Sequence, residues 1–482
     1  MKKTFAFAAA LILSMPAFSQ AQVAPDGGIT PEVLQRISRG YTGNASDKAL
    51  RNALAGNAIN VLATNAGNAA MIDTHFSDEV KTKGITDQKS SGRCWLFTGL
   101  NVMRASVIDR HDLGAFTFSQ NYLFFYDQLE KANLFLQGVI DTKDLPFDDR
   151  KVDWLFSNPI GDGGQFTGVS DLALKYGVVP SDAMPETYSS NNTSQMSSQL
   201  KTVLRQGGLL LRETYEAADL AALKGKKAEA ALKDVSARLQ AVKEDVLSDV
   251  YRILSLCLGV PPQEFEWTRY GSKGEFVSRA TYTPVSFYEE FVGEALNDNY
   301  VMLMNDPTRE YGKVYEIDYD RHVYDGHNWL YINLPVERIK EIAIASIKDG
   351  KAMYFSCDVG KFLNSKKGVL DIANYDYSSL LGVEFTMDKR ERVLTHASGS
   401  SHAMTLMAVD LRDGTPVKWM VENSWGADSG YKGHLIMTDE WFNEYMFRLV
   451  AEKKYIPSDI IDMLAQTPVR LPAWDPMFAP EQ

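Results

Sequence analysis

The stretch SSGRCWLFTGLNVMR, residues 90–104, places a lone cysteine between a glycine-bearing turn and an apolar run. Leu96, Leu100 and Met103 recur at helical spacing. The pattern therefore predicts a helix that begins near Cys94. Unpaired N–H groups and the dipole at a helix start stabilise a thiolate, and thiol pKa values at such sites fall from about 8.5 to about 3.5–7.5. The alternative, a buried structural cysteine, is about as common on sequence grounds alone.

A nucleophilic cysteine needs a base, and two histidines are candidates. His402 opens the apolar run AMTLMAV, which places its ring at a strand end, whereas His396 lies in the looser stretch LTHASGSS. Asn423 follows in VENSWG, and a hairpin through DLRDGTPVK would return it beside His402. An Asn amide oxygen can fix the orientation and tautomer of an imidazole. Trp425 would cover that hydrogen bond and exclude water. The spacing favours His402 and leaves His396 as the rival base.

Acyl transfer also needs hydrogen-bond donors for the developing oxyanion. Gln88 lies in TDQKSSGRC, shortly before Cys94. Its side-chain N–H₂ and the backbone N–H of Cys94 are suited to converge on that charge. Losing one such donor typically costs about 10²–10³ in rate. Taken alone, a glutamine in a loop is usually solvated polar surface.

The composition limits the class of protein. The chain has 482 residues, of which 45% are hydrophobic and 23% charged, an ordinary globular balance. The formal net charge of -12 disfavours binding to the phosphate backbone of nucleic acids. The three cysteines, Cys94, Cys257 and Cys357, are odd in number and lie far apart, which fits neither a disulfide framework nor a metal site. The sequence therefore predicts no metal and no cofactor.

Residues 1–21 are typical of a signal peptide. A charged start precedes an apolar run that is too short to span a bilayer, and Ser19 and Ala21 suit cleavage before Gln22. An N-terminal amphipathic helix is the alternative interpretation. No later stretch of the sequence is typical of a membrane span. We therefore expect a protein exported to the periplasm or the extracellular space.

The pattern of apolar and polar residues changes along the chain. A helical front half and a strand-rich back half predict two lobes with a cleft between them. We expect an N-terminal arm over residues 22–80, a helical lobe with the nucleophile over 81–192, a mostly helical insertion over 193–290, a β-rich lobe with His402 and Asn423 over 291–471, and a C-terminal tail over 472–482.

Three blocks of this sequence resemble the active-site blocks of papain-like cysteine peptidases: DQKSSGRCW, SHAMTLMAV and VENSWG. They are most similar to the bleomycin hydrolase / aminopeptidase C branch, and further blocks such as GGQFTGVSDLALKYGVVP and LCLGVPPQEFEW extend the likeness over most of the chain. Ser91 stands where the papain signature has a cysteine, so the disulfide usual in secreted papain relatives is not expected. The resemblance implies an α+β, papain-like two-lobe fold, with a helical lobe, an antiparallel β-barrel-like lobe and a helical insertion.

The resemblance also assigns roles to residues. It implies Cys94 as nucleophile, His402 as general base and acid, Asn423 as the residue that orients the imidazole, and Gln88 as oxyanion donor. Gly163 and Gly164 match the glycine wall that faces an extended substrate, and we place Trp425 and Gln482 on the substrate side as well. The alternative for the two glycines is a plain tight turn.

The C-terminal tail sets the type of cleavage in the resembling branch. There the tail lies in the active-site cleft and its terminal carboxylate pairs with the α-ammonium of the substrate. For this chain that carboxylate belongs to Gln482, although the ending FAPEQ departs from the small-residue ending typical of the branch. A frayed tail is the alternative.

The expected function is that of a cysteine-type aminopeptidase that releases N-terminal residues from peptides through a thiolate acyl-enzyme. A papain-like endopeptidase or a dipeptidyl-releasing peptidase is the close alternative, and a nucleic-acid-binding protein and a non-catalytic scaffold are the more distant ones. The resemblance further implies a homohexamer with active sites facing an interior channel. The export signal departs from the mostly cytoplasmic branch.

Overall fold

The computed structural model describes residues 27–41, 43–68, 73–218 and 225–477. Within these ranges no helix combines the length and apolar character that crossing a membrane requires. The proposed signal peptide and Gln482 lie outside the described residues. The chain divides into two compact units, residues 1–63 (unit 1) and residues 64–482 (unit 2).

Unit 1 consists of short capped helices. The Thr30 side chain accepts a hydrogen bond from the backbone N–H of Val33, and Pro31 occupies the first turn, where a missing N–H costs nothing. Asn44 and Asp47 form a reciprocal capping box at the next helix. The helices are α1 (Pro31–Ser38), α2 (Ala45–Leu54) and α3 (Ile59–Ala63). Neither α1 nor α2 has a buried residue.

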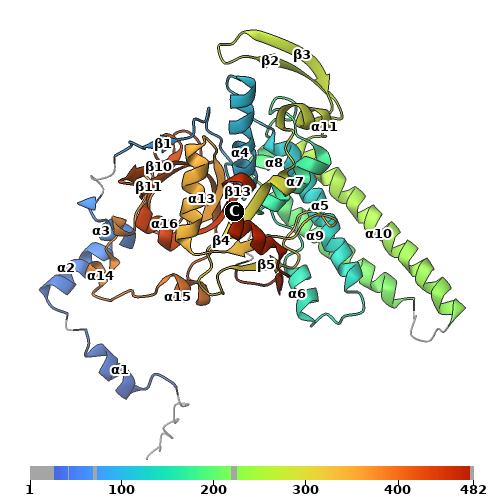
Figure 1. Ribbon diagram of the computed structural model, residues 1–482. Helices are drawn as coiled ribbons and strands as arrows, with labels where there is room; N and C mark the ends of the chain where they lie inside the picture. The colour runs from blue at the N-terminus through green and yellow to red at the C-terminus, as the bar shows by residue number, and fades with distance from the viewer. Residues whose placement is uncertain (1–26, 42, 69–72, 219–224, 478–482) are drawn as a thin grey trace, which may run out of the picture. The chain divides into compact units, whose positions relative to one another are not determined.

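The first part of unit 2 is helical. The helix predicted near residue 94 begins at Cys94 itself and ends at His111, where Asp112 adopts a left-handed conformation. In Figure 1 the long helix α10 runs beside α5 and α9 on one side of unit 2, and these three helices are in contact. The helices of this part are α4 (Cys94–His111), α5 (Gln120–Asp141), α6 (Arg150–Ser157), α7 (Phe166–Tyr176), α8 (Tyr188–Asn191), α9 (Ser194–Glu216), α10 (Lys226–Leu258), α11 (Pro284–Phe287) and α12 (Leu296–Asn299).

A two-stranded hairpin follows α10. Its strands β2 (Phe265–Tyr270) and β3 (Phe276–Tyr282) pair in antiparallel fashion. The region expected to be a mostly helical insertion therefore contains two long helices and this hairpin. The domain boundaries given above stay a prediction.

The second part of unit 2 is built on a 12-stranded, mostly antiparallel sheet. Its strand order is β14-β5-β6-β4-β13-β7-β10-β11-β12-β9-β8, with β1 paired to β10. The strands are β1 (Asp78–Glu79), β4 (Tyr300–Met304), β5 (Lys313–Ile317), β6 (Leu330–Asn333), β7 (Met353–Cys357), β8 (Leu363–Asn364), β9 (Val369–Leu370), β10 (His402–Arg412), β11 (Thr415–Glu422), β12 (His434–Thr438), β13 (Met446–Glu452) and β14 (Val469–Leu471). Its helices are α13 (Val336–Lys348), α14 (Tyr377–Leu381), α15 (Lys389–Leu394), α16 (Asp439–Tyr445) and α17 (Ser458–Ile461).

Two hydrophobic cores position the site. One fills the helical part and includes Trp95, Leu123 and Leu254, and the other fills the sheet part and includes Leu406 and Trp419. Helix α4 packs directly against β10, so its first residue meets the first residues of that strand. The predicted hairpin between residues 402 and 423 is present as the antiparallel pair β10–β11. The expected α+β architecture, with a helical part and a sheet part, is thus confirmed.

Candidate active site

Cys94 is fully buried and is the first residue of α4, with Arg93 as its N-cap residue. The N-terminal end of a helix presents backbone N–H groups and a positive dipole end, both of which favour a thiolate. The backbone N–H of Ala403 donates a hydrogen bond to the Sγ of Cys94 over 3.4 Å. The sulfur therefore lies beside the start of β10, next to His402.

His402 and Asn423 are brought together by the β10–β11 hairpin. The Nε2 atom of His402 lies 2.8 Å from the Oδ1 atom of Asn423, and both side chains are almost fully buried. Because an amide oxygen only accepts, Nε2 donates this bond and Nδ1 is the ring nitrogen that carries the lone pair. The ring of Trp425 lies against the imidazole with the centroids 4.9 Å apart. His402 therefore has a fixed tautomer and a fixed ring orientation.

His396, the rival base, is placed differently. It follows α15, is exposed, and has a backbone φ of 58° in the left-handed region. His402 is the histidine whose neighbour contacts the Cys94 sulfur. The geometry thus favours His402 over His396 as the base.

Gln88 is held in place at the start of the loop of residues 88–93, which leads to α4. Its Oε1 accepts a hydrogen bond from the Ser424 hydroxyl over 2.7 Å, and its backbone N–H donates to the Ser424 carbonyl over 2.8 Å. Its Nε2 donates to the carbonyl oxygen of Ser91 over 2.6 Å. A carboxamide nitrogen has two N–H bonds, so a second donor remains for an oxyanion. The neighbour of Asn423, Ser424, ties this donor to the β10–β11 hairpin, a contact for which the sequence pattern carries no signal.

The glycine loop of residues 161–164 precedes α7. Lys131 donates hydrogen bonds to the carbonyl oxygens of Gly163 over 2.6 Å and of Gly161 over 3.2 Å. A Cβ atom on Gly164 would lie 2.1 Å from the imidazole of His322 and 2.9 Å from the ring of Trp95. Glycine is therefore required at this position, and the loop adjoins the residue that follows the nucleophile. A cavity of about 270 Å³ opens along this loop.

A buried cluster of ionisable side chains packs against the glycine loop. The Oδ2 atom of Asp127 lies 2.9 Å from Nζ of Lys131, and its Oδ1 atom lies 2.5 Å from Nδ1 of His322. Burial raises the pKa of Asp127, but the charge of Lys131 and the contact with His322 lower it more, so it lies below its usual value. Burial, assisted by Lys131, lowers the pKa of His322. The cluster thus joins the side chains of an aspartate, a lysine and a histidine, and its role in the loop was not foreseen from the sequence.

The structure thus gathers Cys94, His402, Asn423, Gln88 and Trp425 at one place. It sets Gly164 beside Trp95, and Gly163 precedes it in the loop. Gln482 and its predicted contact lie outside the described residues. Over the described ranges, no group of three or more His, Cys, Asp or Glu side chains is arranged to hold a metal ion.

A model of the Peptidase C1-like family matches residues 28–478. The chain belongs to this family. It is 39% identical over 406 residues to bleomycin hydrolase of Mus musculus, covering 82% of this chain and 86% of that protein. It is 38% identical over 413 residues to aminopeptidase C of Lactobacillus delbrueckii subsp. lactis, covering 85% and 88%.

A solved structure agrees with these matches. The crystal structure of PepW from Lactobacillus rhamnosis HN001 superposes with a TM-score of 0.87 at 35% identity, and the match covers 95% of this chain and 100% of that one. The resemblance drawn from the sequence is therefore confirmed. The protein is a cysteine peptidase of the Peptidase C1-like family with a papain-like fold.

Proposed function

We propose that this peptidase is a cysteine-type aminopeptidase in which Cys94 is the nucleophile. The observation that carries the proposal is the juxtaposition of the Cys94 sulfur, at the start of α4, with the first residues of β10, where His402 is oriented by Asn423. A nucleophile, a base and a group that orients the base are the three components that this class of covalent catalysis requires.

The geometry supports a complete reaction. Nδ1 of His402 takes the thiol proton, and the thiolate attacks the carbonyl carbon of the first peptide bond. The Cys94 backbone N–H and the carboxamide of Gln88 stabilise the oxyanion. The imidazolium then protonates the leaving amine. Water, deprotonated by His402, attacks the thioester carbonyl, and the C–S bond then breaks to release the amino acid. The imidazolium returns its proton to the Cys94 thiolate.

The C-terminal tail restricts this chemistry to N-terminal residues in our proposal. The described part of the tail is anchored: the Arg448 side chain donates to the Met477 carbonyl over 2.7 Å, and Arg309 forms an ion pair with Asp475. Five residues follow Met477, and we propose that they enter the cleft and present the carboxylate of Gln482 to the substrate α-ammonium. Relatives named aminopeptidase C, G and W support the assignment of aminopeptidase activity.

A pair of matched peptides tests the proposal. With mass spectrometry of the products, we expect a peptide with a free N-terminus to lose single residues and its N-acetylated form to stay intact. Cleavage of the blocked peptide at internal bonds would instead identify an endopeptidase. Loss of hydrolysis in Cys94→Ala checks the nucleophile, and undiminished hydrolysis in that variant would remove the enzymatic proposal altogether.

Truncation tests the role of the tail. Deleting residues 478–482 keeps the anchors at Asp475 and Met477 but removes the proposed carboxylate and the block of the cleft. We expect cleavage of the N-acetylated peptide to rise by about tenfold or more, and release of single residues from the free peptide to fall. Unchanged selectivity in the truncated protein would contradict the role of the tail.

We further propose an exported homohexamer whose substrates are peptides outside the cytoplasm. The signal-like residues 1–21 support export, and the helices of unit 1, which bury none of their α1 or α2 residues, support contacts with other copies. Intact mass of the protein from a periplasmic fraction tests cleavage before Gln22. An uncleaved chain found in the cytoplasm would overturn the proposal of export.

A further inference from the structure

The loop of residues 88–93 carries the proposed oxyanion donor without a disulfide to hold it, since none of the three cysteines is part of a disulfide. We propose that Arg93, with Glu186 as its counter-ion, is the positioning residue of this loop and acts through Ser91 on Gln88. The inference rests on the proposed function, in which the carboxamide of Gln88 stabilises the oxyanion.

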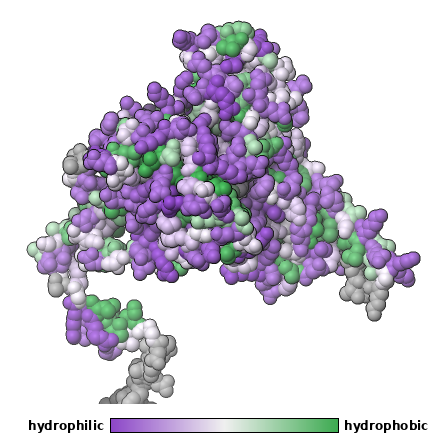
Figure 2. Space-filling model, viewed as in Figure 1, coloured by the Kyte–Doolittle hydropathy of each residue, from purple (hydrophilic) through white to green (hydrophobic). Residues whose placement is uncertain are grey.

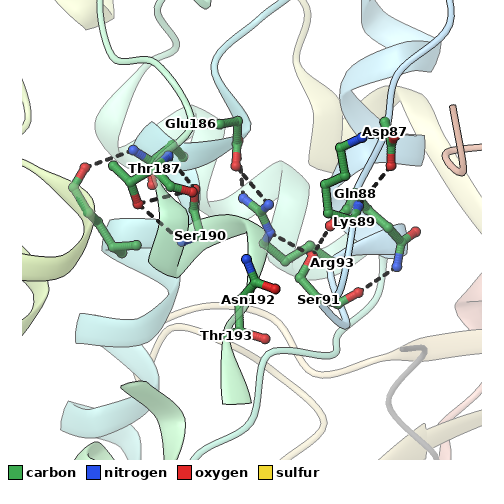
Figure 3. A network of polar contacts seen from close by, with 12 residues as sticks. Asp87, Gln88, Lys89, Ser91, Arg93, Glu186, Thr187, Ser190, Asn192 and Thr193 are labelled. Atoms are coloured by element: carbon green, nitrogen blue, oxygen red, sulfur yellow. Dashed lines mark hydrogen bonds and ion pairs between the residues drawn. The ribbon is translucent and has the colours of Figure 1, made fainter. Parts of the chain in front are cut away.

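The guanidinium of Arg93 is fixed on every side. It is fully buried, and its Nη1 and Nη2 atoms donate to the two carboxylate oxygens of Glu186 over 3.1 and 2.7 Å. Figure 3 shows this two-pronged contact, with Arg93 reaching from the loop toward Glu186. The rings of Phe97 and Phe124 lie 5.2 and 5.1 Å from the guanidinium carbon. A planar fork held in this way has little freedom to move.

The third donor of Arg93 reaches back to the loop. Its Nε donates to the Ser91 hydroxyl over 3.0 Å, and that hydroxyl donates to the Gln88 carbonyl over 2.6 Å. The side chain of Gln88 donates in turn to the Ser91 carbonyl over 2.6 Å. Because the Ser91 oxygen accepts a hydrogen bond from Nε of Arg93, its own proton points to the Gln88 carbonyl oxygen. The guanidinium thus fixes the main chain and the carboxamide of Gln88 together (Figure 3).

Glu186 is itself anchored to the helical part of unit 2. The Thr187 side chain donates to the Cys257 carbonyl over 2.8 Å. The carboxamide of Asn121 donates to the carbonyl oxygens of Pro185 and Leu258, each over 2.8 Å. The counter-ion of Arg93 is therefore tied to α5 and to the end of α10. Through this chain of contacts the long helices hold the oxyanion loop.

Arginine is required for this role. Lysine is a point charge and cannot bind both carboxylate oxygens while it also donates to the Ser91 hydroxyl. We therefore expect Arg93→Lys to lower kcat by about 10–100-fold, because the Gln88 donor shifts from its position. KM should change by less than about threefold. Alkylation of Cys94 by iodoacetamide, which needs the thiolate but no oxyanion donor, should stay within about twofold of the wild-type rate.

A double-mutant cycle with Gln88→Ala separates positioning from general destabilisation. If Arg93 acts through Gln88, Arg93→Lys in the Gln88→Ala protein should lower kcat by less than about threefold. Arg212→Lys is the matched control, since Arg212 is also buried over a ring, that of Phe147, and donates to the Leu145 carbonyl over 2.6 Å. Its kcat should stay within about twofold of wild type.

Two results would overturn the inference: an unchanged kcat in Arg93→Lys, or a loss of the same size with and without Gln88. Should Arg93→Lys show no cooperative melting transition, Ser91→Ala replaces it in the cycle, because that variant keeps the ion pair and removes only the relay. An unchanged kcat in Ser91→Ala, or a loss of the same size with and without Gln88, would then overturn the inference. Hydrolysis that persists in Cys94→Ala would instead overturn the proposed function, so the two failures are distinguishable.

Discussion

At the scale of single residues, the active-site arrangement depends on a few directed hydrogen bonds. The bond from Nε2 of His402 to Asn423 sets the tautomer. The Ser424 hydroxyl holds the carboxamide of Gln88, and the Ser424 carbonyl holds its main chain. Residue type and position along the chain are enough to indicate Cys94 and His402. The partners Ser424 and Glu186 were not predicted, because such contacts depend on how distant segments pack.

One buried residue outside the site makes stability depend on pH. The ammonium group of Lys389 donates to Asn305 Oδ1 and to the Met446 carbonyl over 2.6 Å each, and to the Asn443 carbonyl over 3.1 Å. Its burial lowers its pKa from 10.5 to about 7.

The sign of the effect follows from proton uptake. Between about pH 7 and pH 10 unfolded Lys389 binds a proton that the folded protein has released, so unfolding becomes less favourable as the pH rises. Relative to Lys389→Met, the wild-type free energy of unfolding should gain roughly 1.4 kcal/mol per pH unit in this window and stay level below it. Urea denaturation at several pH values measures the difference. A difference between wild type and Lys389→Met that stays level across this window would contradict the prediction.

At the scale of elements, α4 and α7 pack closely against each other. Helix α4 carries the nucleophile, and α7 follows directly on the glycine loop. The two helices meet at Gly99, where an added Cβ would lie 2.6 Å from a methyl group of the fully buried Val169. The helix at residue 94 and the hairpin after residue 402 were predictable from periodicity and turn residues. This close helix contact was not, since a glycine inside a helical pattern carries no sign of its partner.

The substitution Gly99→Ala tests this packing. Helix propensity alone would make alanine more stable by about 1 kcal/mol, whereas the contact with Val169 predicts a loss of about 1–3 kcal/mol. Thermal denaturation decides between the two signs. Gly360→Ala, at a position with no neighbour within 4 Å of an added Cβ, should leave the Tm unchanged. A higher Tm for Gly99→Ala would show that α4 and α7 are less tightly packed.

At the scale of the whole molecule, unit 1 leaves apolar side chains unburied. Leu34 and Ile37 of α1 are 56% and 59% exposed, and Figure 2 shows hydrophobic surface on this helix. Apolar helix faces of this kind are usually covered by another element. We propose that other copies of the chain cover them in the proposed hexamer.

Removal of the arm separates assembly from folding. A chain that begins at Thr64 retains all of unit 2, so its Tm should stay close to that of the full chain. Light scattering should then report a molar mass below that expected for six chains. The double substitution Leu34→Ser and Ile37→Ser is the milder variant and should weaken the assembly in the same direction. An oligomer of unchanged mass after truncation would show that unit 1 is not needed for the contact.

The position of the nucleophile on α4 and of its base on β10 has a consequence for synthesis. Cys94 leaves the ribosome more than three hundred residues before His402, and Asn423 follows later still. A nascent chain of that length therefore carries a thiol with neither its proposed proton acceptor nor the hairpin that contacts Gln88. We therefore expect the proposed catalytic arrangement to form only after Asn423 has been synthesised.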